Sequence, residues 1–160
     1  MEHQDSNSSN WSNCTDQNDS GKIFNIPADL DIANPDPRKM TKSIIIKSNG
    51  GPEVLELQDV DVGSPGPDEI KVTNHAIGLN FIDTYHRSGL YPLKLPSGIG
   101  LEAAGKVEEI GSNVVEFNIG DNIAYASMPL GAYSQQRIIP SKIAVKVPEG
   151  ITHKQAATLM

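Results

Sequence analysis

Glycine and proline recur at short intervals along residues 41–150, and they restrict what this chain can fold into. Between them lie short apolar runs, several of them β-branched, such as residues 44–46. Because Gly/Pro clusters end a strand and reverse the chain, this pattern predicts a mainly β domain, folded as a closed or partly open barrel. The expected strands cover residues 44–46, 54–60, 69–77, 102–110, 122–127, 132–139 and 143–147.

Only two short segments have the pattern of a helix. Residues 81–88 form one, which Asn80 begins because its short polar side chain can accept from the free N–H groups of the first turn. Thr152 has the same role for a second helix, which is expected to continue to residue 160. These two helices complete the predicted fold class.

The predicted organisation has three parts. Residues 1–40 are a polar tail and linker, expected to be disordered, because residues 1–22 have few apolar side chains and residues 23–39 contain an NPDP run. Residues 41–150 form the β domain. Residues 151–160 form the start of a helix that the end of the chain cuts short.

Charge and cysteine content exclude several classes of function. The net charge is −7, of which residues 1–40 contribute −4 (seven acids, three bases) and residues 41–160 contribute −3 (thirteen acids, ten bases). This acidic balance disfavours general binding to nucleic acid or to an anionic membrane. Cys14 is the only cysteine, so neither an intramolecular disulfide nor a cysteine metal cage is possible. No apolar run suggests a signal peptide or a membrane span, so a reducing, cytoplasmic location is expected.

Residues 78–91 carry most of the side chains with chemical potential. The phenols of Tyr85 and Tyr91 can stack on a planar ring or donate to an oxygen that gains negative charge. The amide of Asn80 can hold a carboxamide or hydroxyl group. A structural explanation remains open for each residue: Asn80 as a helix cap, Asp83 as a partner of the helix N-terminus, and Tyr85 as part of the core.

Other chemistries find less support. The four histidines show no short ligand spacing, so no metal site is predicted. No serine lies in a nucleophile elbow. The glycines of residues 98–105 resemble a phosphate-binding loop, but a strand-like segment follows them where such a loop needs a helix.

Four segments together resemble a known family: GGPEVL (50–55), AIGLNFIDTYHRSGLYP (76–92), LPSGIGLEAAGKVEEIG (95–111) and GAYSQ (131–135). In this order they are similar to the N-terminal catalytic domain of the zeta-crystallin-like quinone oxidoreductases, a zinc-free branch of the medium-chain dehydrogenases/reductases. The resemblance implies a GroES-like β-barrel and a metal-independent hydride transfer from NADPH to quinones or related enones.

The resemblance also implies site residues. Zinc-dependent relatives have a cysteine where Asn80 stands and a histidine where Leu101 stands, so the implied site has no metal. Tyr85 and Asn80 are the expected catalytic residues, with Tyr85 donating a hydrogen bond to the quinone oxygen. The residues expected to contact the cofactor are Asn80, Phe81, Asp83 and Tyr125, and those expected to contact the substrate are Tyr85 and Tyr91.

Members of this family continue into a Rossmann domain that holds the cofactor phosphates, and the 160 residues do not include it. We therefore expect this chain alone to have little or no reductase activity. Members of the family form homodimers, but their dimer interface lies largely in the same missing domain. The resemblance therefore does not predict that this chain alone forms a dimer. The alternative hypothesis is a non-enzymatic GroES-like module that binds a protein partner or AU-rich RNA, although the acidic charge counts against RNA. The preferred quinone stays open.

Overall fold

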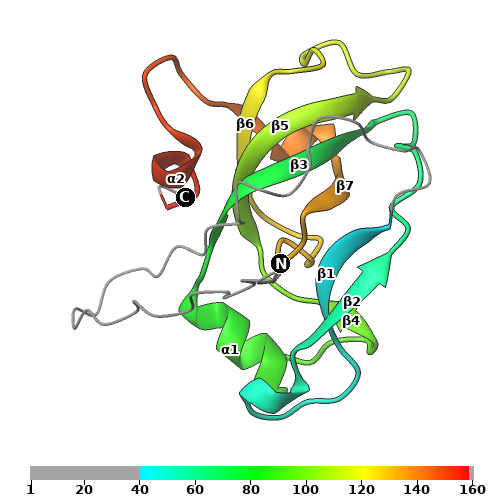
Figure 1. Ribbon diagram of the computed structural model, residues 1–160, viewed down its shortest axis with the longest axis vertical. Helices are drawn as coiled ribbons and strands as arrows, with labels where there is room; N and C mark the ends of the chain where they lie inside the picture. The colour runs from blue at the N-terminus through cyan, green and yellow to red at the C-terminus, as the bar shows by residue number, and fades with distance from the viewer. Residues whose placement is uncertain (1–39, 159–160) are drawn as a thin grey trace, which may run out of the picture.

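Two antiparallel sheets make up most of the structure, a computed structural model that describes residues 40–158 (Figure 1). The smaller sheet has the order β2-β1-β4, and the larger has the order β7-β3-β5-β6-β8. The strands are β1 (Thr41–Ile46), β2 (Glu56–Val60), β3 (Glu69–Gly78), β4 (Ser97–Gly98), β5 (Glu102–Ile110), β6 (Asn122–Ala126), β7 (Gln136–Pro140) and β8 (Val145–Lys146). The prediction of a mainly β, partly open barrel with two short helices is confirmed. The predicted disordered tail and residues 159–160 lie outside the described residues. The second helix, predicted to continue to residue 160, ends at Ala156 and is followed by a turn at residues 157–158.

The larger sheet carries the main core. Strand β3 is hydrogen-bonded to β5 on one side and to β7 on the other. Ten buried side chains form one apolar cluster: Ile70, Val72, Ala103, Val107, Val114, Phe117, Ile123, Tyr125, Ala132 and Ile139. Burial of this many apolar groups is the main stabilising contribution to the domain.

The two sheets meet along β1. An isolated bridge joins Ser43 to Ser134, the Ile44 N–H donates to the Tyr133 carbonyl (2.7 Å), and the Gln135 N–H donates to the Lys42 carbonyl (2.9 Å). The prediction of a strand over residues 132–139 is therefore too long, since β7 begins only at Gln136. Residues 132–135 pass between the sheets, where their backbone groups bond to β1 and to the Ile99–Gly100 loop instead of a regular ladder.

Three other predicted strands are also too long, and the one over residues 122–127 extends one residue past the end of β6 at Ala126. Pro52 begins a 3-10 turn, η1 (Pro52–Val54), so β2 starts at Glu56 instead of residue 54. Leu57 in β2 is 65% exposed, because β2 is an edge strand. A second 3-10 turn, η2 (Ser141–Ile143), limits β8 to two residues.

The helices lie against different sheets. Helix α1 (Phe81–Ser88) follows β3 and lies beside the smaller sheet, where the Gly50 N–H donates to the Arg87 carbonyl (Figure 1). Helix α2 (His153–Ala156) packs on β3, β5 and β6 through a cluster of small side chains: Ala76, Ala104, Ala124, Ala156 and Ala157. As predicted, Thr152 begins it, and its hydroxyl accepts from the Gln155 N–H. No helix within residues 40–158 is long and apolar enough to cross a membrane.

Candidate active site around helix α1

Asn80 links the start of α1 to strand β5. It is the N-cap residue, as predicted, and its backbone N–H donates to Asp83 Oδ2 (3.0 Å) while the Asp83 N–H donates to the Asn80 carbonyl (3.0 Å). The side-chain amide makes a further hydrogen bond, in which Asn80 Nδ2 donates to Glu102 Oε2 at 2.7 Å. A bond to a carboxylate is strong, so it fixes the orientation of this amide.

Glu102 is the buried acceptor of that bond and is 2% exposed. It lies at the start of β5, opposite Gly78 at the end of β3. A Cβ at Gly78 would collide with the Glu102 carboxylate and with the Ala157 carbonyl. Glycine at this position therefore makes room for the carboxylate beneath the start of α1.

Asp83 is held on the buried side of α1 and is 4% exposed. Its Oδ2 also accepts from the Tyr133 hydroxyl at 2.9 Å, while its Oδ1 has no hydrogen-bond partner. Burial, together with the nearby Asp83 carboxylate, raises the pKa of Tyr133 above its usual value. Tyr133 therefore stays protonated and serves as a fixed donor to Asp83.

An aromatic surface covers the outer side of the helix. Tyr85 contacts both Phe81 and Tyr91 edge to face, with ring centroids 5.5 and 5.4 Å apart, and Tyr91 also contacts His86 (5.8 Å). Phe81 is 76% exposed and Tyr91 is 47% exposed, whereas Tyr85 is partly buried between them. Exposed ring faces beside a fixed amide and phenols suit a flat, polar-edged ligand.

Tyr125 lies apart from this group. It has no exposed surface, its ring belongs to the main core, and its hydroxyl donates to Asn74 Oδ1 (2.9 Å). The expectation that Tyr125 contacts the cofactor is therefore not met in this structure. Its position near the end of β6, paired with Ala103 of β5, points the side chain into the core.

The structure thus brings together Phe81, Tyr85 and Tyr91 on the outer side of α1, whereas Asn80 begins the helix and Asp83 lies on its buried side. It adds two residues that were not predicted as site residues. Tyr133 and Glu102 hold Asp83 and Asn80 from strands or loops far away in the sequence. Both occur in segments that carry the family resemblance, GAYSQ and GLEAAG, which was the only signal for them. Within residues 40–158, no group of three or more His, Cys, Asp or Glu side chains has the geometry to hold a metal ion.

Comparison with known proteins agrees with the fold. The sequence model of the alcohol dehydrogenase GroES-like domain matches residues 66–149, just over half of the chain. The quinone oxidoreductase of Pseudomonas aeruginosa is 54% identical over 122 residues, which are 76% of this chain and 38% of that protein. Quinone oxidoreductase 1 of Escherichia coli is 49% identical over 120 residues, which are 74% of this chain and 36% of that protein.

Solved structures give the same result. The Pseudomonas syringae quinone oxidoreductase superposes with a TM-score of 0.74 at 52% identity, covering 76% of this chain and 38% of that one. The Escherichia coli quinone oxidoreductase complexed with NADPH superposes with a TM-score of 0.73 at 47% identity, covering 74% of this chain and 37% of that one. The chain thus spans less than two fifths of the length of these relatives. It belongs to the family of alcohol dehydrogenase GroES-like domains, and the resemblance to quinone oxidoreductases is confirmed.

Proposed function

We propose that this chain is the substrate-facing part of an NADPH-dependent quinone reductase, which transfers a hydride to a quinone or a related enone. The aromatic surface of α1 beside the fixed Asn80 amide is the observation that carries the proposal. The names of the similar proteins support the reaction, and the NADPH complex of the Escherichia coli relative supports the cofactor.

The residues around α1 fit a nicotinamide ring. Phe81 offers a largely exposed ring face, and Asn80 offers an amide whose orientation Glu102 fixes. These groups match a flat ring that carries a carboxamide. When bound, NADPH supplies the hydride, and the side chains of this chain position the acceptor against it.

Tyr85 is the proposed catalytic residue. Its phenol is flanked by Phe81 and Tyr91, which restrict its movement. A hydrogen bond from this phenol to the quinone oxygen strengthens as the oxygen gains negative charge, so it stabilises the transition state more than the ground state. Tyr91 supplies a second ring face against the substrate. Asp83 is a positioning residue, because it is buried and bonds to the Asn80 N–H and to Tyr133.

We propose that the reaction needs no metal. Asn80 and Leu101 stand where, by family resemblance, zinc-dependent relatives have their cysteine and histidine ligands. The Leu101 side chain has no ligand atom, and Asn80 has a neutral amide in place of a thiolate, with its Nδ2 bonded to Glu102. Polarisation of the acceptor oxygen then rests on Tyr85 in place of a Lewis acid.

A chimera tests this proposal. The corresponding segment of the Pseudomonas aeruginosa quinone oxidoreductase is replaced by residues 42–158 of this chain, and NADPH oxidation with 9,10-phenanthrenequinone is measured. We expect turnover within about tenfold of the parent enzyme, and little or no turnover from the 160-residue chain alone. A chimera that folds and binds NADPH but reduces no quinone would contradict the proposal.

Variants of the chimera assign the roles. Tyr85→Phe keeps the ring and removes the donor, so kcat is expected to fall by about 10- to 100-fold with KM for NADPH unchanged. Asn80→Ala is expected to raise KM for NADPH. Lys142→Gln, an exposed change in η2, is the control and leaves both constants unchanged. Equal kcat in Tyr85→Phe and the control would remove Tyr85 from the mechanism.

A further inference from the structure

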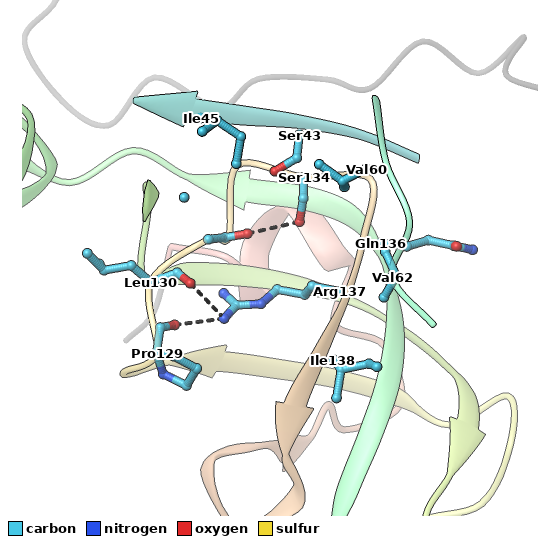
Figure 2. Close-up of a pocket in the computed structure, with 12 residues that line it drawn as sticks. Ser43, Ile45, Val60, Val62, Pro129, Leu130, Ser134, Gln136, Arg137 and Ile138 are labelled. Carbon is cyan, nitrogen blue, oxygen red and sulfur yellow. Dashed lines mark hydrogen bonds between the residues drawn. The ribbon is translucent and has the colours of Figure 1, made fainter. Parts of the chain in front are cut away.

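A cavity that is largely open to solvent lies between the two sheets, away from the aromatic surface of α1. Its volume is about 290 Å³, and its walls come from β1, β2, β7 and the loop that contains Pro129, Leu130 and Gly131 (Figure 2). Apolar side chains line part of this cavity: Ile45 from β1, Val60 from the end of β2 and Val62 just after β2. The proposed function makes no use of this cavity.

Arg137 of β7 reaches into this cavity and is only 8% exposed. Its Nη2 donates to the carbonyls of Pro129 (2.7 Å) and Leu130 (3.1 Å), which hold the guanidinium in place (Figure 2). Its Nη1 is buried and has no hydrogen-bond partner. A buried donor left unpaired is costly, so burial of this guanidinium lowers the stability of the domain.

The charge of Arg137 has no carboxylate partner among the residues that the structure describes. None of the ion pairs formed among residues 40–158 includes it, and its described partners are two carbonyls and the side chain of Tyr125, whose ring centroid lies 5.4 Å from Cζ. A buried charge is normally paired with an opposite charge. A water molecule in the cavity would leave the positive charge unbalanced.

We propose that this cavity binds a small organic monocarboxylate. The carboxylate lies against the guanidinium of Arg137 and neutralises its charge, and Ser43 lines the same space. The apolar wall formed by Ile45, Val60 and Val62 receives a short hydrocarbon part. An inorganic anion lacks that part, and a neutral alcohol lacks the charge, so both bind more weakly.

A titration of the ¹⁵N-labelled 160-residue chain tests the proposal, with butyrate, n-butanol and inorganic phosphate as probes at constant ionic strength. With butyrate, the amide signals of Gly131, Ser134 and Gln136 are expected to shift along saturable curves. The affinities for n-butanol and phosphate are expected to be lower by about tenfold or more. The aromatic surface of α1 serves as an internal reference, and its signals stay unchanged.

Two variants and one control locate the site. Arg137→Gln removes the charge, and Val62→Phe fills the apolar side while Arg137 stays in place; each is expected to lower butyrate affinity by about tenfold or more. Lys94→Gln removes one exposed positive charge and leaves the affinity unchanged. If Arg137→Gln does not give a native amide spectrum, Val62→Phe decides the question.

Three results would overturn the proposal. Equal affinity for butyrate and n-butanol would show an apolar cavity without selectivity for an anion. Unchanged butyrate affinity in Val62→Phe, or in a folded Arg137→Gln variant, would place the binding elsewhere. The absence of any saturable shift would mean that the cavity holds only water.

Discussion

Tyr133 connects the loop between β6 and β7 to helix α1 through its bond to Asp83. The ring can take this position only because it packs directly against Gly100, where a Cβ would collide with it. Gly100 also has a φ of +88°, in the left-handed region that favours glycine. One residue without a side chain thus determines where the donor to Asp83 lies.

The first prediction concerns Gly100→Ala. We expect it to lower the free energy of unfolding by about 2–4 kcal/mol, because backbone strain at positive φ adds to the clash with the Tyr133 ring. Gly120→Ala is the matched control: its φ is +91°, but nothing lies within 4 Å of an added Cβ. That variant should lose only the backbone contribution, about 1–2 kcal/mol. Urea unfolding measures both, and equal losses would contradict the role given to the Tyr133 contact.

At this scale the sequence predicted the local part of the candidate site and missed the rest. Asn80, Asp83 and Tyr85 lie within one helical turn and a half, so short-range patterns place them together. Tyr133 and Glu102 join them only through the fold, at sequence separations of 50 and 22 residues from their partners. Tyr125 has the same chemistry as Tyr85, and only the pairing of β5 with β6 reveals that it is buried.

The strands that the sequence predicted well are those with a clear local pattern, whereas segments whose conformation depends on distant partners in the fold were predicted poorly. The strands over residues 69–77 and 102–110 were close to the observed β3 and β5, because both are long, apolar and flanked by Gly/Pro turns. The segment 132–135 has a strand-like composition, but it crosses between the sheets and bonds to β1 and the Ile99–Gly100 loop. Such partners are far away in the sequence and leave no local pattern.

Helix α2 depends on a pair of histidines as well as on its alanines. His153 of α2 lies against His75 of β3, with ring centroids 4.7 Å apart, and His153 Nε2 lies 3.0 Å from Asn122 Oδ1. Burial lowers the pKa of both imidazole rings. A positive charge on His75 lowers the pKa of His153 further, and the positive charge of Lys106 lowers the pKa of both. Glu108 partly opposes this effect at His75. The folded state therefore favours the neutral pair.

The second prediction follows from the sign of these shifts. In the unfolded chain a histidine binds its proton with a pKa near 6.5, so below that pH the unfolded state binds more protons than the folded one. Stability should be complete well above pH 6.5 and fall as the pH drops from about 7.5 to 5.5, before the carboxylates titrate. His75→Gln should flatten this dependence, as measured by urea unfolding at each pH. The same slope in His75→Gln and the unaltered chain would contradict it.

The two sheets differ in how many stabilising contacts their strands make. Strands β3 and β5 each have a neighbour on both sides, and together they carry four of the ten side chains of the apolar cluster. Strand β2 pairs only with β1, and Leu57 is exposed. The smaller sheet therefore depends on the few backbone bonds that β1 makes to the segment 133–135.

This asymmetry predicts how the domain opens. Amides of residues 56–60 should exchange with solvent about 100-fold faster than those of residues 70–77 and 103–109, because an edge strand can separate without exposing the apolar cluster. Hydrogen exchange followed by mass spectrometry, repeated at low urea concentrations, measures the difference. Exchange of the β2 peptide should depend little on urea, since its local opening exposes little surface, whereas the β3 and β5 peptides should follow global unfolding. If all three peptides respond to urea with the same slope and the same free energy, the two sheets open as one unit, and the bonds between β1 and residues 133–135 are stronger than their number suggests.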